Sequence, residues 1–217
     1  MSLPMLAVSA FVIALSGAMM PGPLLTYCVN GSLRRGFIAG PLIITGHAIL
    51  ELLLVILLLS GLNNLFSSDL FAAVVGIIGG FVLIVMAADM IKSAVKKEVS
   101  LEKEVSEESS KEVKPSGFII PGALVSLSNP YWTIWWATIG ITYLVSASQQ
   151  GIAGAGAFFV GHITADYVWY ALIAFVVSRG RKFLNDRIYR YLIIFFALVL
   201  VYFGLTFLSE GLQFYWF

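Results

Sequence analysis

Six long apolar segments, almost free of charged residues, divide this sequence and limit the folds open to it. Roughly 20 apolar helical residues cross a bilayer core. Helices are needed there because lipid offers the backbone polar groups no hydrogen-bond partners. The sequence therefore predicts an all-α integral membrane protein with six transmembrane helices, at residues 3–28, 37–60, 70–90, 117–148, 152–177 and 191–209.

The overall composition leads to the same class of protein. Of the 217 residues, 59% are hydrophobic and only 12% are charged, whereas a soluble domain is about 25% charged. Such a chain has too little charge to cover a soluble surface. This excludes a soluble enzyme, a nucleic-acid-binding protein and a disordered protein, and it makes the lipid bilayer the first expected partner.

The basic residues are confined to three connections, which follow the first, third and fifth apolar segments. Connections rich in Lys and Arg favour the cytoplasmic side. We therefore expect a multi-pass protein of the cell (cytoplasmic) membrane with both termini outside and a charged cytoplasmic linker at residues 92–116. The thirteen basic residues are Arg34, Arg35, Lys92, Lys96, Lys97, Lys103, Lys111, Lys114, Arg179, Arg181, Lys182, Arg187 and Arg190.

A short motif occurs once in each half of the chain. Gly46-His47 is followed by Glu51, and Gly161-His162 is followed by Asp166, with three residues between each histidine and its acid. These are the only two histidines, and residues at i and i+4 share one helix face. Each motif lies on the second of three helices. The sequence thus predicts two inverted three-helix repeats, residues 1–91 and 117–217.

The depth of the two motifs indicates a site. Each histidine lies about eleven residues, or roughly 17 Å, into its helix, so the pairs approach the bilayer midplane from opposite sides. Inverted-repeat transporters bind substrate there, and ionisable residues inside a membrane usually line a polar pathway. The alternative is that each His–carboxylate pair only ties neighbouring helices together.

Prolines interrupt the first helix of each half. Pro21-Gly22-Pro23 lies in the first segment and Asn129-Pro130 in the fourth. Proline lacks an N–H and removes a helical hydrogen bond, which should free carbonyls such as those of Gly17 and Ser126. Broken helices can bind the charged ends of a substrate, and Asn129 adds a side-chain donor and acceptor. The alternative is a purely structural kink.

Tryptophan and cysteine carry no clear chemistry. The single Cys28 excludes a disulfide framework and a CxxC site. We interpret the five tryptophans as packing residues or anchors at the membrane interface: Trp132, Trp135, Trp136, Trp169 and Trp216.

These motifs together resemble the LysE/RhtB family of amino-acid exporters, in the wider LysE superfamily. The resemblance rests on Pro21-Gly22-Pro23, the glycine-spaced stretch 31–40, Asn129-Pro130 and Asp166, and it covers nearly the whole chain. It implies secondary-active efflux of amino acids or similar small molecules, driven by a proton or membrane gradient. Two features depart from the family pattern. Tyr131 stands where many members have a basic residue, and the His47–Glu51 pair matches no general motif.

The leading interpretation is an efflux transporter with alternating access at a midplane site. His47, Glu51, His162, Asp166 and Asn129 would bind substrate or carry coupling protons, since histidine titrates near neutral pH. No catalytic motif supports an enzyme and no cofactor is implied. The substrate, the coupling proton or ion and the oligomeric state, a homodimer included, stay open. The alternative is a divalent metal exporter with His47, Glu51, His162 and Asp166 as ligands, because imidazole and carboxylate suit zinc or manganese.

Overall fold

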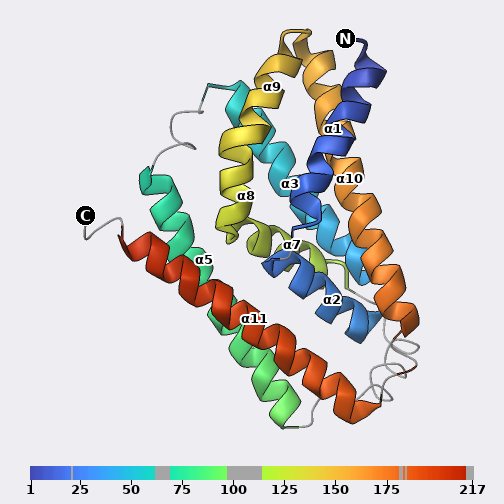
Figure 1. The fold of residues 1–217 in the computed structure, drawn as a ribbon, viewed down its shortest axis with the longest axis vertical. Helices are drawn as coiled ribbons and strands as arrows, with labels where there is room; N and C mark the ends of the chain where they lie inside the picture. The colour runs from blue at the N-terminus through green and yellow to red at the C-terminus, as the bar shows by residue number, and fades with distance from the viewer. Residues whose placement is uncertain (21, 62–68, 97–113, 181–182, 184, 214–217) are drawn as a thin grey trace.

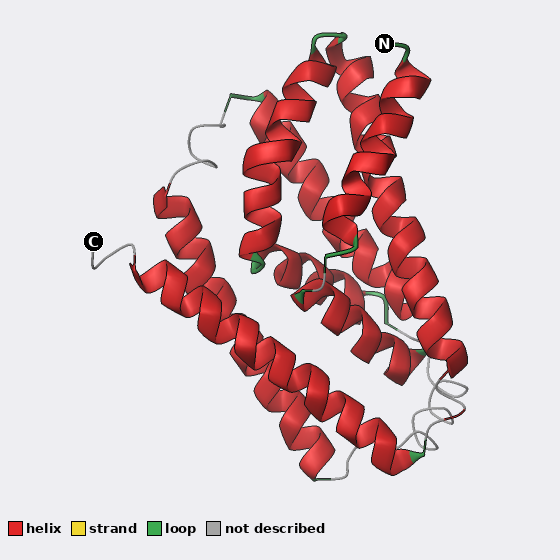
Figure 2. Ribbon diagram, viewed as in Figure 1, coloured by secondary structure: helices red, strands yellow, loops and turns green. Residues whose placement is uncertain are grey.

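The computed structural model describes residues 1–20, 22–61, 69–96, 114–180, 183 and 185–213. Within these ranges every regular element is a helix (Figure 2). Pro21 and the central part of the expected linker, residues 97–113, lie outside the described residues. The helices of the two halves have the following bounds. In the first half they are α1 (Leu3–Ala18), α2 (Pro23–Arg35), α3 (Ala39–Leu59) and α5 (Asp69–Val95); in the second half they are α7 (Ser116–Leu127), α8 (Pro130–Trp135), the π-helical turn η1 (Trp136–Gly140), α9 (Ile141–Ser148), α10 (Gly151–Gly180) and α11 (Asp186–Gln213).

Four of the described helices are long and apolar enough to cross a membrane: α3, residues 73–95 of α5, α10 and α11. They coincide with the second, third, fifth and sixth expected spans. The first expected span is divided into α1 and α2, which are bent by 83° and would make a fifth span if counted together. The fourth is divided into α7, α8, η1 and α9. The two broken segments are those in which the sequence places prolines.

Helices of one half pack mainly against helices of the other (Figure 1). α1 packs along α10, and α7 packs along α3, so the first helix of each half lies on the second long helix of the opposite half. The third long helices of the two halves, α5 and α11, pack against each other. α3 and α10, which carry the two motifs, are also in contact.

The glycine of each motif makes one of these crossings possible. A Cβ at Gly46 would lie 1.9 Å from the carbonyl oxygen of Ile119 in α7, and a Cβ at Gly161 would lie 2.1 Å from that of Ala7 in α1. No real side chain tolerates such distances. Small residues at membrane helix crossings let the backbones approach closely. The motif glycines therefore seat each histidine helix against the broken helix of the other half.

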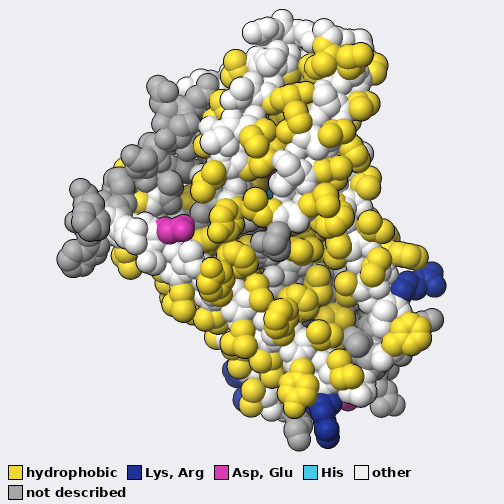
Figure 3. All heavy atoms as spheres, viewed as in Figure 1, with side chains coloured by type: hydrophobic (Ala, Val, Ile, Leu, Met, Phe, Trp, Pro, Cys, Tyr) yellow, Lys and Arg dark blue, Asp and Glu magenta, His cyan; other side chains and the backbone are white. Residues whose placement is uncertain are grey.

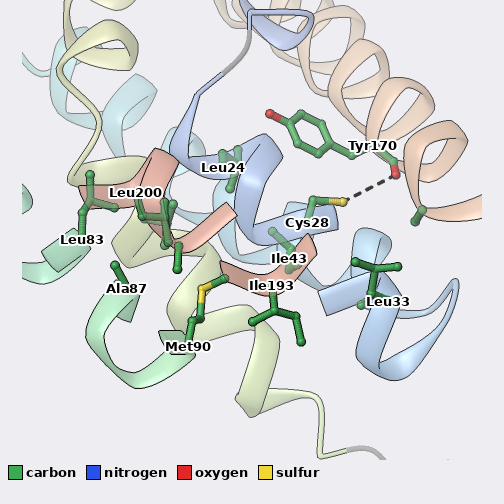
Figure 4. Packing of buried hydrophobic residues seen from close by; sticks show 14 of the residues in the cluster. Leu24, Cys28, Leu33, Ile43, Leu83, Ala87, Met90, Tyr170, Ile193 and Leu200 are labelled. Carbon is green, nitrogen blue, oxygen red and sulfur yellow. Dashed lines mark hydrogen bonds between the residues drawn. The ribbon is translucent and has the colours of Figure 1, made fainter. Parts of the chain in front are cut away.

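Two clusters of buried side chains form the core. One joins α2, α3, α5, α10 and α11 with one residue each of α1 and α7, and the other joins α1, α3, α8, η1, α9 and α10. In the first cluster, Cys28 of α2 points toward α10, where its thiol donates to the backbone carbonyl of Tyr170 over 3.9 Å (Figure 4). Leu24 and Ile43 flank this contact (Figure 4). The cysteine thus serves as a small packing residue between two helices.

The outer surface is largely apolar. Leucine, isoleucine, valine and phenylalanine side chains are exposed on α3, α5, α10 and α11, and hydrophobic side chains cover most of the face in Figure 3. In this view the lysines and arginines gather at the end of the molecule opposite the N-terminus. Such a surface is suited to lipid, which solvates apolar side chains.

Candidate functional site

The four ionisable side chains of the two motifs meet between α3 and α10. Within the first motif, His47 Nε2 lies 3.1 Å from Glu51 Oε1. Within the second, His162 Nε2 lies 3.5 Å from Asp166 Oδ2. The two motifs also pair with each other, because His162 Nε2 lies 3.0 Å from Glu51 Oε2 and His47 Nε2 lies 3.8 Å from Asp166 Oδ2. All four residues are buried, so the structure brings the sequence-predicted cluster together.

Two tryptophans that the sequence did not assign to the site hold one of these acids. The indole Nε1 groups of Trp132 and Trp136 both donate to Glu51 Oε1, over 3.0 and 2.8 Å. The two residues are four apart in the continuous run of α8 and η1 and are buried. Their burial in the second core cluster agrees with the expectation of packing residues, but their hydrogen bonds to Glu51 were not expected. The available signal was their spacing next to Asn129-Pro130, which puts them on one face of a helix that starts at a break.

The histidines have different surroundings. His47 Nδ1 lies 2.8 Å from the hydroxyl of Ser126, which itself donates to the Gly122 carbonyl, so the ring is fixed by α7. His162 is surrounded by aromatic rings instead. The ring centroids of Trp135, Trp136 and Phe158 lie 4.8, 5.4 and 5.8 Å from that of His162. Its Nδ1 is buried and has no hydrogen-bond partner.

The two helix breaks face each other beside this cluster. Gly22 is the extended residue before α2, and Pro23 is the first residue of that helix. In the second half, Asn129 caps α8 by accepting a hydrogen bond from the Tyr131 N–H over 3.1 Å, and Pro130 begins the helix. A Cβ at Gly22 would lie 3.7 Å from the side-chain nitrogen of Asn129. The amide of one break therefore lies next to the backbone of the other.

The backbone at these breaks differs from the expectation in one respect. The carbonyls of Gly17 and Ser126 were expected to be free, but they accept hydrogen bonds from Met20 N and Asn129 N, over 3.1 Å each. The last turns of α1 and α7 tighten so that each carbonyl finds a donor three residues ahead, a common ending for helices. The N–H groups in the first turn of α2 have no side-chain cap, because the N-cap residue of this helix is Gly22.

A cavity of about 70 Å³ joins the ionisable cluster to both breaks. A buried water needs roughly 10–15 Å³ measured in this way, so the cavity can hold a small polar molecule or several waters. Among the described residues that line it there is no lysine or arginine. Its lining comprises Ala14, Gly17, Ala18, Met20, Gly22, Leu24, Leu25, His47, Glu51, Ser126, Asn129, Tyr131, Trp132, Trp135, His162, Asp166 and Tyr170.

Part of this cluster has the spacing of metal ligands. His47, Glu51 and Asp166 each offer one ligand atom, and these atoms lie within 4.8 Å of one another. In the structure the same atoms are paired among themselves, and Glu51 is also bound by two indoles. A cation entering here would have to displace these donors from the carboxylates.

Comparisons with known proteins identify the family of this chain. No curated protein and no solved structure matches the chain. The model of the LysE type translocator family matches residues 15–211, which include both breaks, both motifs and every cavity-lining residue except Ala14. This match spans most of the 217 residues and confirms the resemblance seen in the sequence. The chain belongs to the LysE type translocator family and is a multi-pass membrane transport protein.

Proposed function

We propose that this protein is a secondary-active exporter of amino acids or similar small molecules, which bind in the cavity between the two breaks. Family membership supports the export of such compounds. One observation carries the location of the site: the ionisable residues of both halves meet in a single cavity that also reaches Gly22 and Asn129. A site made jointly by two halves can be exposed alternately on either side as the halves rock, which is the usual mechanism of inverted-repeat carriers.

The proposed architecture is six spans in two inverted repeats, residues 1–91 and 117–217, joined by the linker 92–116. The exchange of helices supports it, since α1 on α10 has its counterpart in α7 on α3. The paired glycines support it too, because Gly46 and Gly161 occupy the same motif position and each faces the first helix of the other half. In this scheme α1 with α2 forms the first span, and α7 to α9 form the fourth.

The charged ends of an amino acid would find complementary groups at opposite sides of the cavity. The first N–H groups of a helix lack partners within the helix, so the start of α2 at Leu24 and Leu25, together with the amide of Asn129, would bind a carboxylate. Glu51 and Asp166 would bind an ammonium group or carry coupling protons. His47 and His162 would exchange protons with them, because histidine changes charge near neutral pH.

The orientation proposed for the protein is termini outside and basic connections in the cytoplasm of the cell. The described basic residues support it by their position at one end of the molecule, away from the N-terminus (Figure 3). They lie at the ends of α2, α5 and α10, before α7 and at the start of α11, and Lys and Arg in short connections favour the cytoplasmic side.

Counterflow in proteoliposomes tests the proposed function. Vesicles containing the purified protein are loaded with one unlabelled amino acid and diluted into the same radiolabelled amino acid, for each of the twenty, with and without a pH gradient. We expect accumulation of at least one amino acid, reduced by Asp166→Asn and unaffected by Trp169→Phe. Absence of counterflow for all twenty would contradict the proposal. Accumulation of radioactive manganese or zinc instead would favour the metal alternative.

A further inference from the structure

The two carboxylates of the cluster have unequal surroundings, although their motifs match. Four nitrogen atoms lie within 3.1 Å of the Glu51 oxygens: Nε1 of Trp132, Nε1 of Trp136, Nε2 of His47 and Nε2 of His162. The nearest of these histidine nitrogens to Asp166 Oδ2 is 3.5 Å away. Glu51 Oε2 and Asp166 Oδ2 are both buried without a hydrogen-bond partner, so the difference between the acids lies at Glu51 Oε1, which accepts two indole hydrogen bonds.

The tryptophan bonds account for this difference. An indole N–H is a donor only, and hydrogen bonds to an ionised carboxylate are shorter and about twice as strong as neutral ones. Trp132 and Trp136 place two such donors on the same oxygen, Glu51 Oε1. In the second motif, none of the hydrogen bonds described in the structure brings an indole to Asp166. Trp135, a third tryptophan of the same segment, donates to Ser16 of α1 instead.

The two tryptophans connect the second half of the chain to Glu51 in the first half. They belong to α8 and η1, the segment that starts at the Asn129 break, whereas Glu51 belongs to α3 in the other half. π-Helical turns within α-helices often mark functional sites. Gly140 at the end of this turn lies against the Trp136 ring, because a Cβ there would be 2.6 Å from Trp136 Cε3. The absence of a side chain at Gly140 therefore leaves room for the Trp136 ring, whose Nε1 reaches Glu51.

We propose that Trp132 and Trp136 are positioning residues that fix Glu51 as the anchoring carboxylate of the site, so that Asp166 is the carboxylate that meets the transported molecule. This inference rests on the proposed function and deepens it by dividing the roles of the two acids. The groups facing Glu51 are His47 from its own helix, His162 and Asp166 from α10, and the two indoles. Substrate entering the cavity finds Glu51 Oε1 held by two indoles, whereas the histidine nitrogens around Asp166 Oδ2 are farther away, at 3.5 and 3.8 Å.

The hydrogen bonds from the two indoles to Glu51 can be tested without a transport assay. In the full-length protein in nanodiscs, labelled with ¹⁵N-tryptophan, the Nε1–H resonances of Trp132 and Trp136 are assigned from the Trp132→Phe and Trp136→Phe variants. We expect Glu51→Gln, which replaces a charged acceptor with a neutral one, to move both resonances. Asp166→Asn should leave them in place. The inference is overturned if Glu51→Gln leaves both resonances unmoved.

The division of roles is tested by counterflow of the amino acid that the wild-type protein transports fastest. Losing a hydrogen bond to a charged group corresponds to a change of about tenfold. We expect Trp132→Phe and Trp136→Phe each to lower the maximum rate by about this factor with the apparent KM little changed, whereas Asp166→Asn raises the apparent KM. Trp169→Phe is the matched control. It removes an indole N–H in the same way, but the Nε1 of Trp169 makes no hydrogen bond.

The outcomes separate this inference from the proposed function. If Trp132→Phe and Trp136→Phe transport like Trp169→Phe, the tryptophans do not position the site and the inference fails while the proposed function stands. If the wild-type protein transports no amino acid, the proposed function fails, and the resonances still decide whether the indoles hold Glu51. If one phenylalanine variant does not fold, its indole resonance is assigned by elimination from Trp→Phe variants at the other tryptophans, and the Glu51→Gln spectrum then decides the question.

Discussion

His162 Nε2 lies 3.0 Å from Glu51 Oε2, closer than the 3.5 Å that separates it from Asp166, the acid of its own motif. A residue of the second half is thus paired most closely with a residue of the first. An isolated i, i+4 pair would only stabilise its own helix. The cross-pairing makes the two halves share one buried charge cluster, so a movement of one half against the other must rearrange it.

Neutralising either acid should strongly reduce transport while the protein still folds. Glu51→Gln and Asp166→Asn keep side-chain size but remove a charged hydrogen-bonding group, a loss of about 1.5–3 kcal/mol, or about tenfold or more in rate. Counterflow in proteoliposomes measures the rate, and size-exclusion chromatography in detergent checks folding. If both variants transport at the wild-type rate, neither acid belongs to the site.

Gly46→Ala should destabilise the protein. Alanine favours a helix over glycine by about 1 kcal/mol, but the added methyl would lie 1.9 Å from the Ile119 carbonyl oxygen, and backbone cannot yield as a flexible side chain does. Overpacking of this kind costs about 1–3 kcal/mol, so we expect a lower Tm in detergent. Gly156→Ala in α10 is the control, since a methyl there meets no heavy atom within 4 Å. Equal melting of the two variants would contradict the close crossing of α3 and α7.

Asn129 should have two separable roles, as a helix cap and as a donor in the cavity. Asn129→Ala removes the acceptor for Tyr131 N–H and should lower stability by about 0.5–2 kcal/mol. Asn129→Asp keeps the cap but replaces the amide donor beside Gly22 with a negative charge. We expect the aspartate variant to melt near the wild-type temperature and to lose amino-acid counterflow. Wild-type transport by the aspartate variant would show that the amide does not contact substrate.

The orientation of the chain can be measured with reporters at the C-terminus. Because the basic residues lie at or near the connections after α2, α5 and α10, we expect an alkaline phosphatase fusion, which works only outside the cytoplasm, to be active. A green fluorescent protein fusion, which folds only in the cytoplasm, should stay dark. The opposite pattern would reverse the orientation and place the basic connections outside.

Much of the fold could be read from local features of the sequence. The apolar segments predicted α3, α5, α10 and α11, and the prolines predicted breaks in the remaining two segments. The prolines did not predict how the freed carbonyls would be satisfied. The Gly17 carbonyl accepts from Met20 because the end of a helix can tighten by one residue, a choice that depends on the geometry of the turn rather than on residue type.

The candidate site was only partly visible in the sequence. The i, i+4 spacing put each histidine beside its own acid, since that distance is set by the helix itself. The donors from Trp132 and Trp136 reach Glu51 from 81 and 85 residues away. No local pattern relates positions so far apart. The sequence analysis interpreted both as packing residues or interface anchors, and only the tertiary contacts show that they also bind Glu51.

The sequence by itself determined that this chain lies in a membrane, where its helices break and which four ionisable residues lie deep among apolar ones. These properties depend on hydrophobicity, proline and helical spacing, all of which act within a few turns of one helix. Only the tertiary structure decided that the two motifs meet and that their acids differ. That difference arises because packing brings two indole donors to Glu51 Oε1, whereas none of the hydrogen bonds described in the structure brings an indole to Asp166.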